Sequence, residues 1–438
     1  MDKQTAKQKV MESIEENGDR IIEFGRDVWD NPELGFKEER TARKVELFFE
    51  ELGLSYESGL AITGVRADVS GSVHDLRMAI MGELDAVVCH EHPESDPETG
   101  AIHACGHNGQ LAVMLGTALG LISSGISDKL GGDLAFIAVP AEEFIELDYR
   151  EQLQKKGALE FFGGKQELIR EGVLDDIDLA AMVHHNAETP ERVFKISAGS
   201  NGFLGKTVRY LGQEAHAGAF PHQGVNALNA AMLGIMGVHA QRETFRDEDA
   251  IRVHPILTRG GDLVNIVPAD VSIETYVRGR TIDAILEAND KVNRALQAGG
   301  YAVGAEVKIH EIPGYLPLKS ETTMNDLFGR NARAILGEES VVTSEASGGS
   351  TDMGDISQLM PAIHPYVGGV EGKAHARDYE IVDEEMAYVI AAKVMACMVV
   401  DLLWDDAEQA RQIAEKFEPT YTKEGYLSMW RNVVEVEE

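Results

Sequence analysis

The stretch Leu134-Ala135-Phe136-Ile137-Ala138-Val139-Pro140-Ala141-Glu142-Glu143 joins six apolar residues to a pair of carboxylates. A short apolar run of this kind predicts a strand buried in the interior of a sheet. The two glutamates follow directly where that strand ends. Ligand sites in open α/β sheets form at the carboxyl ends of strands, so this stretch predicts an α/β layer with a polar site at its edge.

Two further apolar runs repeat this pattern in the part of the chain before residue 195. Residues 76–81 and 179–183 both have strand character, and residues 111–122 between them are typical of a buried helix. Strands that alternate with helices predict a largely parallel sheet, so the fold class expected here is α/β.

Residue types that bind metal ions follow each of these strands. Asp85 comes after the first strand, and His184-His185 come after the third. Of Glu142 and Glu143, one could bind a metal ion while the other acts as a general base on water. Asp85 could bind metal or orient a ligating imidazole, and Glu83 could do either. Each residue alone could equally be a satisfied or solvated side chain, but ligand types at the end of every strand favour a metal site.

The segment His103-Ala104-Cys105-Gly106-His107 precedes the predicted buried helix. Alternate residues of an extended segment point to the same side, so Cys105 and His107 could bind one ion together. A thiolate and an imidazole suit ions of the Zn²⁺ or Mn²⁺ class, and the thiolate favours the softer ones. Taken alone, the triplet could also be a buried cysteine beside histidines that start a helix.

The rest of the chain is expected to interrupt and then complete this α/β layer. Residues 196–311 follow the order strand, helix, strand, strand, helix, strand, which predicts a small α+β sandwich of ferredoxin-like type. Residues 312–438 return to α/β character. We therefore expect that segments 1–195 and 312–438 form one catalytic domain and that segment 196–311 is an inserted domain. Residues 146–170 are charged and helical, and we expect a small lid or surface helix there.

Composition restricts the class of protein. Hydrophobic residues make up 44% and charged residues 26% of the 438 residues, a balance typical of globular proteins. A net charge of -34 disfavours nucleic acid as a partner. No apolar run reaches the ~20 residues that span a bilayer, and the polar start has no signal-peptide pattern. Three cysteines in so long a chain favour a reducing compartment, so we expect a cytoplasmic protein without a membrane partner.

Nearly the whole chain resembles the aminoacylase/carboxypeptidase-type metallopeptidases. The resemblance is to their amidohydrolase branch, which includes hippurate, auxin-conjugate and aminobenzoyl-glutamate hydrolases. Residues 350–355, Ser-Thr-Asp-Met-Gly-Asp, look most like the aminobenzoyl-glutamate hydrolases. The other stretches that carry the resemblance are 31–36, 38–42, 103–107, 140–143, 212–217, 226–228, 265–268, Arg278 and 372–375.

The resemblance implies a role for each matching residue. Glu142 would be the general base, and Asp85 would orient an imidazole. The metal ligands, for two ions of Mn²⁺ or Zn²⁺ type per subunit, would be Cys105, His107, Glu143, His184 and His375.

The resemblance also implies a homodimer formed through the inserted domain, which would serve as a dimerisation and lid domain. His216 would cross the dimer interface and help to stabilise the oxyanion in the active site of the partner subunit. Asn265, Arg278 and Ser350 would contact a small-molecule substrate.

The chain departs from the family pattern at three places. Asn108 stands where the family usually has Asp, and residues 87–100 differ from the usual short turn. The family has one ligand where this chain has His184-His185, and we favour His184 because the motif places the ligand directly after the strand.

The function expected from these residues is hydrolysis of the amide bond of small N-acyl or N-aroyl amino acids by a metal-activated water. Two other enzymatic activities would use the same metal site, namely deamination of an aromatic amine and a dipeptidase or carboxypeptidase activity. A non-catalytic module that binds metal or ligand is the alternative from another class. That module would be expected to lack Glu142, a metal ligand or His216, and this chain has all of them.

Overall fold

A computed structural model describes residues 1–185 and 191–434 of the chain, which divide into two compact units. Unit 1 contains Met1–Gly199, Lys319–Ala346 and Asp355–Lys423. Unit 2 contains Ser200–Leu318, Ser347–Gly354 and residues 424–434. The chain passes between the units after Gly199 and after Leu318, where the sequence analysis placed boundaries at 195 and 311. Two short later segments also join unit 2.

A six-stranded sheet forms the centre of unit 1, in the order β1-β2-β6-β3-β7-β16. Strands β6, β3, β7 and β16 run parallel to one another, and β1 and β2 form an antiparallel edge of the sheet. Every residue of β6 is buried, as expected for a strand covered on both faces. The strands are β1 (Tyr56–Leu60), β2 (Gly64–Val69), β3 (Arg77–Glu83), β6 (Asp133–Val139), β7 (Leu179–Ala181) and β16 (Ala362–Ile363).

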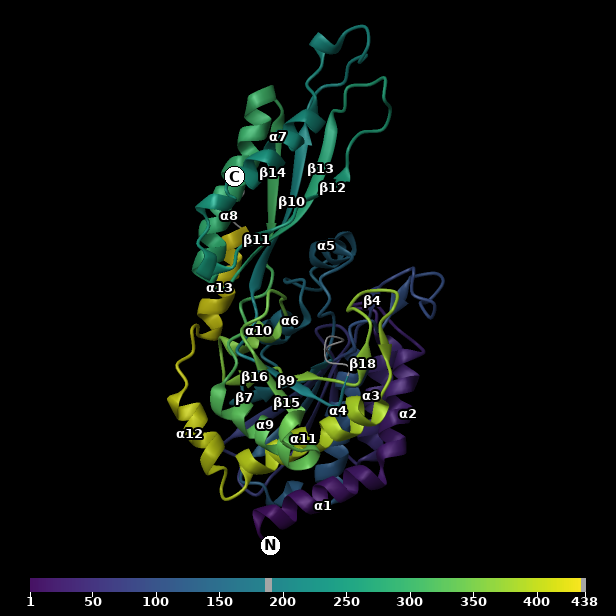
Figure 1. Ribbon diagram of the computed structural model, residues 1–438, viewed down its shortest axis with the longest axis vertical. Helices are drawn as coiled ribbons and strands as arrows, with labels where there is room; N and C mark the ends of the chain where they lie inside the picture. The colour runs from purple at the N-terminus through teal and green to yellow at the C-terminus, as the bar shows by residue number, and fades with distance from the viewer. Residues whose placement is uncertain (186–190, 435–438) are drawn as a thin grey trace. The chain divides into compact units, whose positions relative to one another are not determined.

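Helices α1 (Lys3–Glu16), α2 (Gly18–Trp29), α4 (His107–Ser123) and α11 (Ala391–Leu403) pack against one another, and α4 lies on β3 (Figure 1). Helix α4 is buried along almost its whole length, so apolar residues surround it on every side. Helix α3 (Glu39–Glu51) contacts β1 and β2 instead. The main hydrophobic core of unit 1 therefore lies between the sheet and this helical layer.

The segment Glu385–Leu403 has the length and apolar composition of a membrane-spanning helix, so the expectation that no stretch does was wrong. It begins as a π-helical turn, Glu385–Ile390, and continues as α11. In the structure, 89% of its most apolar stretch is buried inside the protein. Its apolar residues therefore form part of the core of unit 1.

Shorter elements complete unit 1. Residues 362–367 form two short strands separated by His364-Pro365, so that β16 ends the first sheet and β17 (Tyr366–Val367) joins a second one. The second sheet also contains β15 (Val341–Ser344), β9 (Phe194–Ser197) and β8 (His184–His185). The remaining elements include two hairpins and several helices: β4 (Val87–Val88) with β5 (Ala101–Ile102), β18 (Val370–Glu371) with β19 (Glu380–Ile381), α5 (Leu147–Lys155), α6 (Gly164–Glu171), α9 (Thr322–Leu336), α10 (Met353–Ser357) and α12 (Glu408–Lys416).

Unit 2 is an antiparallel sheet with two helices packed on it (Figure 1). The order β11-β13-β10-β14, with β12 beside β13, is that of a ferredoxin-like sandwich. Residues of β13 alternate between buried and half-buried, as expected when one face of a sheet meets helices. Its elements are β10 (Gly202–Leu211), α7 (Ala227–Ala240), β11 (Arg252–Val253), β12 (Ile256–Arg259), β13 (Asp270–Gly279), α8 (Ile282–Val303) and β14 (Glu306–Ile312). The predicted fold class, an α/β catalytic domain with a mostly parallel sheet and a second α+β domain, is confirmed.

Candidate metal centre

The carboxyl ends of three parallel strands of unit 1 bring candidate ligands together. Glu83 is the last residue of β3 and Asp85 follows it. Glu142 and Glu143 follow β6, and His184 lies in β8 just after β7. Because these strands are parallel neighbours in one sheet, their polar ends meet at the same edge.

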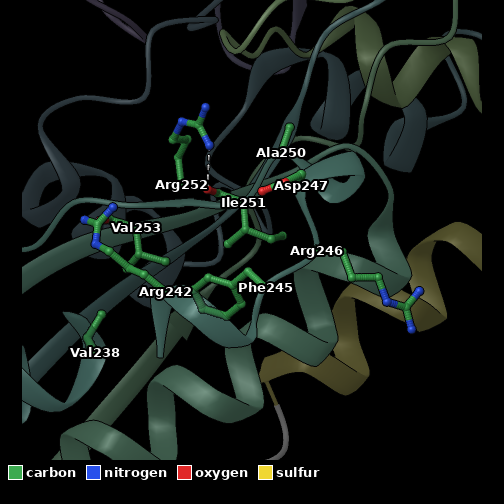
Figure 2. Close-up of a pocket in the computed structure, with 9 residues that line it drawn as sticks. All are labelled: Val238, Arg242, Phe245, Arg246, Asp247, Ala250, Ile251, Arg252 and Val253. Atoms are coloured by element: carbon green, nitrogen blue, oxygen red, sulfur yellow. Dashed lines mark hydrogen bonds between the residues drawn. The ribbon is translucent and has the colours of Figure 1, made fainter. Parts of the chain in front are cut away.

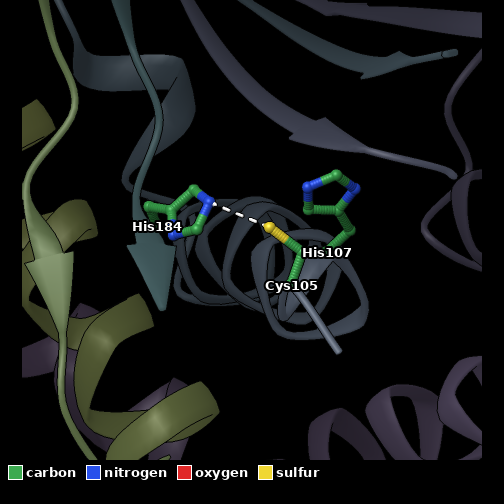
Figure 3. Close-up of side chains that lie close together, drawn as sticks. All are labelled: Cys105, His107 and His184. Carbon is green, nitrogen blue, oxygen red and sulfur yellow. Dashed lines mark hydrogen bonds between the residues drawn. The ribbon is translucent and has the colours of Figure 1, made fainter. Parts of the chain in front are cut away.

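Cys105 precedes helix α4, and His107 is the first residue of that helix (Figure 3). Gly106 between them has a φ of 83°, in the left-handed region that favours glycine. A Cβ at Gly106 would lie 2.5 Å from the Tyr379 hydroxyl and 2.7 Å from the His185 Cβ. This glycine therefore allows both the thiol and the imidazole to face the strand ends.

Three groups of side chains in unit 1 could each hold a metal ion. Within each group the ligand atoms all lie within 4.8 Å of one another, the groups being Cys105–His107–His184, Cys105–Glu143–His375 and Glu83–His107–Glu142. The Cys105 Sγ is 3.5 Å from Nε2 of His184, toward which it points in Figure 3, and 3.3 Å from Nε2 of His375. That Nε2 of His375 is also 3.1 Å from Oε1 of Glu143. Because Cys105 occurs in two groups and a thiolate can bind two ions, the arrangement fits neighbouring ions that share this ligand.

Asp85 is buried and holds the imidazole of His107. Its Oδ1 lies 3.2 Å and its backbone oxygen 2.8 Å from Nδ1 of His107. Its Oδ2 accepts the backbone N–H of Glu143 at 2.9 Å. An Nδ1–H that donates to Asp85 leaves Nε2 of His107 free to bind a metal ion. The structure therefore places Asp85 where it can orient a ligand, which is one of the two roles that the sequence left open.

The turn that carries the two glutamates depends on a third one, Glu38. Ala141 has a φ of 51°, which is uncommon for a residue with a Cβ. The buried Glu38 accepts the backbone N–H of Ala141 at 2.8 Å and the hydroxyl of Thr63 at 2.7 Å. Glu38 thereby holds the backbone directly before Glu142.

Only one histidine of the pair at 184 and 185 faces the cysteine. His184 approaches Cys105 with Nε2, while its Nδ1 lies 2.7 Å from the backbone oxygen of His185. His185 turns the other way, with Nε2 at 2.8 Å from the backbone oxygen of Ala387. Burial lowers the pKa of His185 to about 4 and that of His103 to about 3, and neither histidine belongs to any of the three groups.

Neighbouring charges shift the pKa values of the ligands. Burial and Glu143 raise the pKa of the Cys105 thiol, but His184 and His107 outweigh them and lower it to about 6. Burial likewise opposes ionisation of Glu143, yet His375 and His107 lower its pKa to about 2. The Glu143 carboxylate in turn raises the pKa of His375 to about 11. A thiolate and several carboxylates thus gather at neutral pH, which favours a cation among them.

Buried acceptor atoms in this centre fit divalent cations. Nε2 of His107, Oε2 of Glu83 and Oε1 of Glu143 are buried and have no hydrogen-bond partner among the described residues. A buried polar atom without a partner is costly, and cations bound in the groups that contain these atoms would satisfy them. Thiolate, imidazole and carboxylate together form the ligand set that ions of the Zn²⁺ and Mn²⁺ class bind.

Lys165 is a residue of this centre that the sequence analysis missed. Its Nζ lies 2.6 Å from Oε1 of Glu83, and both side chains are fully buried. Lys165 lies in the charged segment 146–170, where it was assigned to a lid or surface helix. The signal that could have found it is Glu83 itself, because a carboxylate at the end of a buried strand needs a buried cationic partner.

The other predicted site residues lie in unit 2. His216 and Asn265 are exposed, and Nδ1 of His216 accepts the backbone N–H groups of Gly218 and Ala219. Arg278 is half-buried and donates from Nη1 to Oγ of Ser350 at 2.8 Å. In unit 2, Arg278 and Ser350 therefore contact each other, while His216 lies at a separate position.

Unit 2 also contains a cavity of about 360 Å³ that is lined by apolar residues together with Arg242, Arg246, Arg252 and Asp247 (Figure 2). The guanidinium groups do not converge, because Arg246 points away from Arg242. Arg252 hydrogen-bonds the backbone oxygen of Ile251. None of the predicted site residues lines this cavity.

A family model described as peptidase family M20/M25/M40 matches residues 79–401. This range begins in β3, ends in α11 and contains every candidate ligand of the centre. It covers well over half of the chain.

Known proteins are similar to this chain over most of its length. The chain is 27% identical to a Xaa-Arg dipeptidase of Mus musculus, over 92% of this chain and 90% of that protein. It is 27% identical to an N-acyl-L-amino acid amidohydrolase of Geobacillus stearothermophilus, over 71% of this chain and 81% of that protein. The fold is similar to that of a dinuclear metal-binding peptidase of family M20 from Bacillus subtilis, with a TM-score of 0.66 and 23% identity over 88% of this chain and 98% of that chain.

Proposed function

The chain belongs to peptidase family M20/M25/M40, and we propose that it hydrolyses the amide bond of small N-acyl or N-aroyl amino acids. Membership of the family makes it a metal-dependent hydrolase of amide or peptide bonds. The finer proposal concerns the substrate, which would carry a free carboxylate next to the bond that is cleaved.

Arg278 is the observation that carries this choice of substrate. Its guanidinium lies 5.4 Å from the ring centres of both Phe203 and Tyr276, and its pKa is lowered by burial. No carboxylate among the described residues pairs with it, and Ser350 is its hydrogen-bonding partner. A half-buried arginine without an acidic partner is suited to bind the carboxylate of an amino acid, and the two rings would lie beside an acyl or aroyl group.

Glu142 would move the proton during hydrolysis. When bound, divalent cations in such a centre activate a water molecule and polarise the carbonyl of the amide. Glu142 is almost buried, with Oε2 at 3.9 Å from Nε2 of His107, so it can take a proton from that water. The same carboxyl group then gives the proton to the leaving nitrogen. Asp85 keeps His107 in place throughout, because both its oxygens are engaged.

His216 is suited to donate to an oxyanion. Its Nδ1 accepts two backbone N–H groups, so in the neutral ring the proton is on Nε2. An exposed Nε2–H can stabilise the negative charge that develops on the amide oxygen. We propose that it does so in the active site of a partner subunit, and that Asn265 contacts the same substrate.

We further propose two ions of Mn²⁺ or Zn²⁺ type per subunit, in a cytoplasmic protein. Sharing of the Cys105 thiolate between two ligand groups supports two ions. All three cysteines, Cys89, Cys105 and Cys397, are free, as is usual in a reducing compartment.

Unit 2 carries the surface for the proposed homodimer. Large apolar side chains are exposed there, and Val264 is fully exposed. The others are Phe220, Met232, Leu233, Met236, Ile256, Leu257, Leu263 and Ile266. Exposed apolar patches of this kind mark interaction sites. The double variant M232E/M236E should be monomeric by analytical ultracentrifugation, whereas V342E, at an exposed valine of unit 1, should sediment as the unchanged protein does.

A metal-reconstituted substrate screen tests the proposed function. The protein is loaded with Mn²⁺ or Zn²⁺ and offered N-acetyl, N-benzoyl and aminobenzoyl amino acids together with Xaa-Arg dipeptides. Release of an amino acid from the N-acyl compounds is expected. Release from dipeptides alone would favour a dipeptidase, to which the relative from Mus musculus points, and release of ammonia would favour a deaminase. Absence of both metal and turnover would leave a non-catalytic module.

The variant E142Q tests the general base. It should keep its metal content by elemental analysis and lose turnover by at least ~10²–10⁴-fold. E146Q is the matched control, because Glu146 pairs with Lys37 at the surface. Retained turnover in E142Q would show that Glu142 is not the base.

A further inference from the structure

We propose that Glu83 binds the same cation as His107, and that Lys165 holds the other oxygen of this carboxylate. The inference rests on the proposed metal-dependent function and adds a sixth ligand to the five that the resemblance implies. It follows from atoms that face one another in the buried part of unit 1.

The first observation is a pair of acceptor atoms at short distance. Oε2 of Glu83 lies 3.1 Å from Nε2 of His107, and both side chains are essentially inaccessible to solvent. Neither atom has a hydrogen-bond partner among the described residues. Asp85 engages Nδ1 of this ring, so Nε2 is the atom that faces Glu83. The contact needs a positive charge between the two atoms, and a divalent cation would take the place of a proton on Nε2.

The separation of these atoms also fits joint coordination. Nitrogen and carboxylate ligands lie at about 2.0–2.2 Å from a Zn²⁺-type ion. Two such ligands at roughly a right angle on one ion are therefore about 3 Å apart, close to the observed distance between Glu83 and His107. The carboxylate of Glu142, the proposed general base, lies within 4.8 Å of both ligand atoms, so it can reach a water molecule at this cation.

Lys165 explains how a carboxylate can be kept in this position. Its Nζ contacts Oε1 of Glu83 at 2.6 Å, which leaves only Oε2 directed at His107. Both members of the pair are fully buried, so the lysine offsets one negative charge inside the protein. Lys165 is on helix α6 and Glu83 is on β3, so α6 would fix one oxygen of the ligand from outside the sheet.

The charge of the centre also supports Glu83 as a metal ligand. Five acidic groups gather here, namely Glu83, Asp85, Cys105, Glu142 and Glu143, and Lys165 neutralises one of them. The other negative groups lie beside imidazoles, which favours divalent cations among them. Without Glu83 as a participant, the charge of Lys165 would have no role in the centre.

The test measures metal binding in E83Q. The variant keeps the shape of the side chain and removes its charge. We expect one of the two ions to bind at least ~100-fold more weakly in a chelator-competition titration, since loss of even an indirect partner of a ligand costs 10–100-fold. The visible absorption of the Co²⁺-loaded protein should change as well. E311Q is the matched control, because Glu311 forms a buried ion pair with Lys206 in unit 2 at 2.7 Å.

A second variant and a structure keep the test decisive. E83Q/K165M removes both buried charges, so it leaves no unpaired lysine, and it should lose the same ion. In a crystal structure of the Mn²⁺-loaded wild-type protein, Oε2 of Glu83 should lie at about 2.2 Å from an ion. Unchanged affinity and spectrum in E83Q, or an ion far outside that distance, would overturn the role of Glu83 while wild-type hydrolysis still stands. A wild-type protein that binds no divalent ion would overturn the proposed function instead.

Discussion

Gly106 shows how one residue changes the geometry of a motif. The spacing of Cys105 and His107 predicts two side chains on the same side of an extended segment. In the structure the segment is not extended, because Gly106 is left-handed and His107 already starts helix α4. The two side chains nevertheless converge, since the turn at Gly106 redirects the chain between them. The two side chains therefore meet as predicted, but they do so because of this turn and not because the segment is extended.

The two adjacent histidines provide a prediction at this scale. H184Q should lose metal, because His184 faces Cys105, and H185Q should keep the metal content of the unchanged protein. Elemental analysis after dialysis measures both. The glutamine at position 185 can still contact the backbone oxygen of Ala387, which makes H185Q a matched control. Loss of metal in H185Q alone would reverse the assignment.

Glu38 makes the stability of the protein depend on pH. Burial and the nearby charge of Asp85 raise its pKa from the ordinary 4.5 to about 7. The raised pKa means that the stabilisation is complete below about pH 4.5 and is lost as the pH rises through 7. The free energy of unfolding should therefore fall by at most about 3 kcal/mol from this group between pH 5 and pH 8.5.

The variant E38Q removes this pH dependence. It should be more stable than the wild-type protein at pH 8.5 and similar to it at pH 5, in denaturant titrations at both pH values. E39Q, at the exposed neighbour, is the control and should follow the wild-type protein. A pH profile of E38Q that matches that of the wild type would contradict the assignment.

Asn108 joins several helices of unit 1, a role that the sequence did not indicate. Asn108 stands out as a departure from the family pattern, next to a metal ligand. In the structure it is fully buried, and its Nδ2 donates to the backbone oxygen of Gly25 and to the Tyr388 hydroxyl, each at 3.0 Å. Asn108 therefore connects α4 with α2 and with the π-helical turn, and it contacts helices rather than open space.

The variant N108A should lower the stability of this helical layer. It leaves two buried groups, on Gly25 and Tyr388, without their partner, which costs about 1–3 kcal/mol. Thermal unfolding at a fixed metal concentration measures the loss. The order of preference among N-acyl substrates should stay the same. A changed order with unchanged stability would mean that Asn108 acts on the substrate.

At the scale of the whole molecule, the metal centre links distant parts of the chain. Its ligand candidates extend from Glu83 to His375 and come from the ends of three strands, one helix and one hairpin turn. Ions bound only by the folded protein stabilise it, because an unfolded chain cannot bring these residues together. The acidic surplus at the centre adds to this effect, since removal of the cations leaves like charges close together.

Metal removal should therefore destabilise the entire unit 1. With a metal ion at 1,000 times its dissociation constant, each site contributes about 4 kcal/mol to the free energy of unfolding. The midpoint of thermal unfolding should fall after treatment with a chelator and return when Mn²⁺ or Zn²⁺ is added back. Mg²⁺ is the comparison ion, since it prefers oxygen ligands and should restore less. An identical midpoint with and without chelator would contradict a metal centre.

The fold class and the kinds of ligand could be predicted from the sequence, because both follow from local patterns of residues. The apolar run 134–139 is a strand wherever it lies, and a glutamate pair directly after it must come to the edge of the sheet. The insertion of a ferredoxin-like unit followed from the order of strands and helices along residues 196–311. The buried segment Glu385–Leu403 shows the limit of local reading, because composition alone does not tell a core helix from a spanning one.

Which of these side chains contact one another depends on the tertiary structure. His184 rather than His185 faces Cys105 because β8 pairs with β17 in one register, which sets the direction of both rings. Lys165 reaches Glu83 because helix α6 is folded back onto the end of β3, a contact across 82 positions of sequence. Such pairings depend on how elements pack, and no local pattern of residues contains that information.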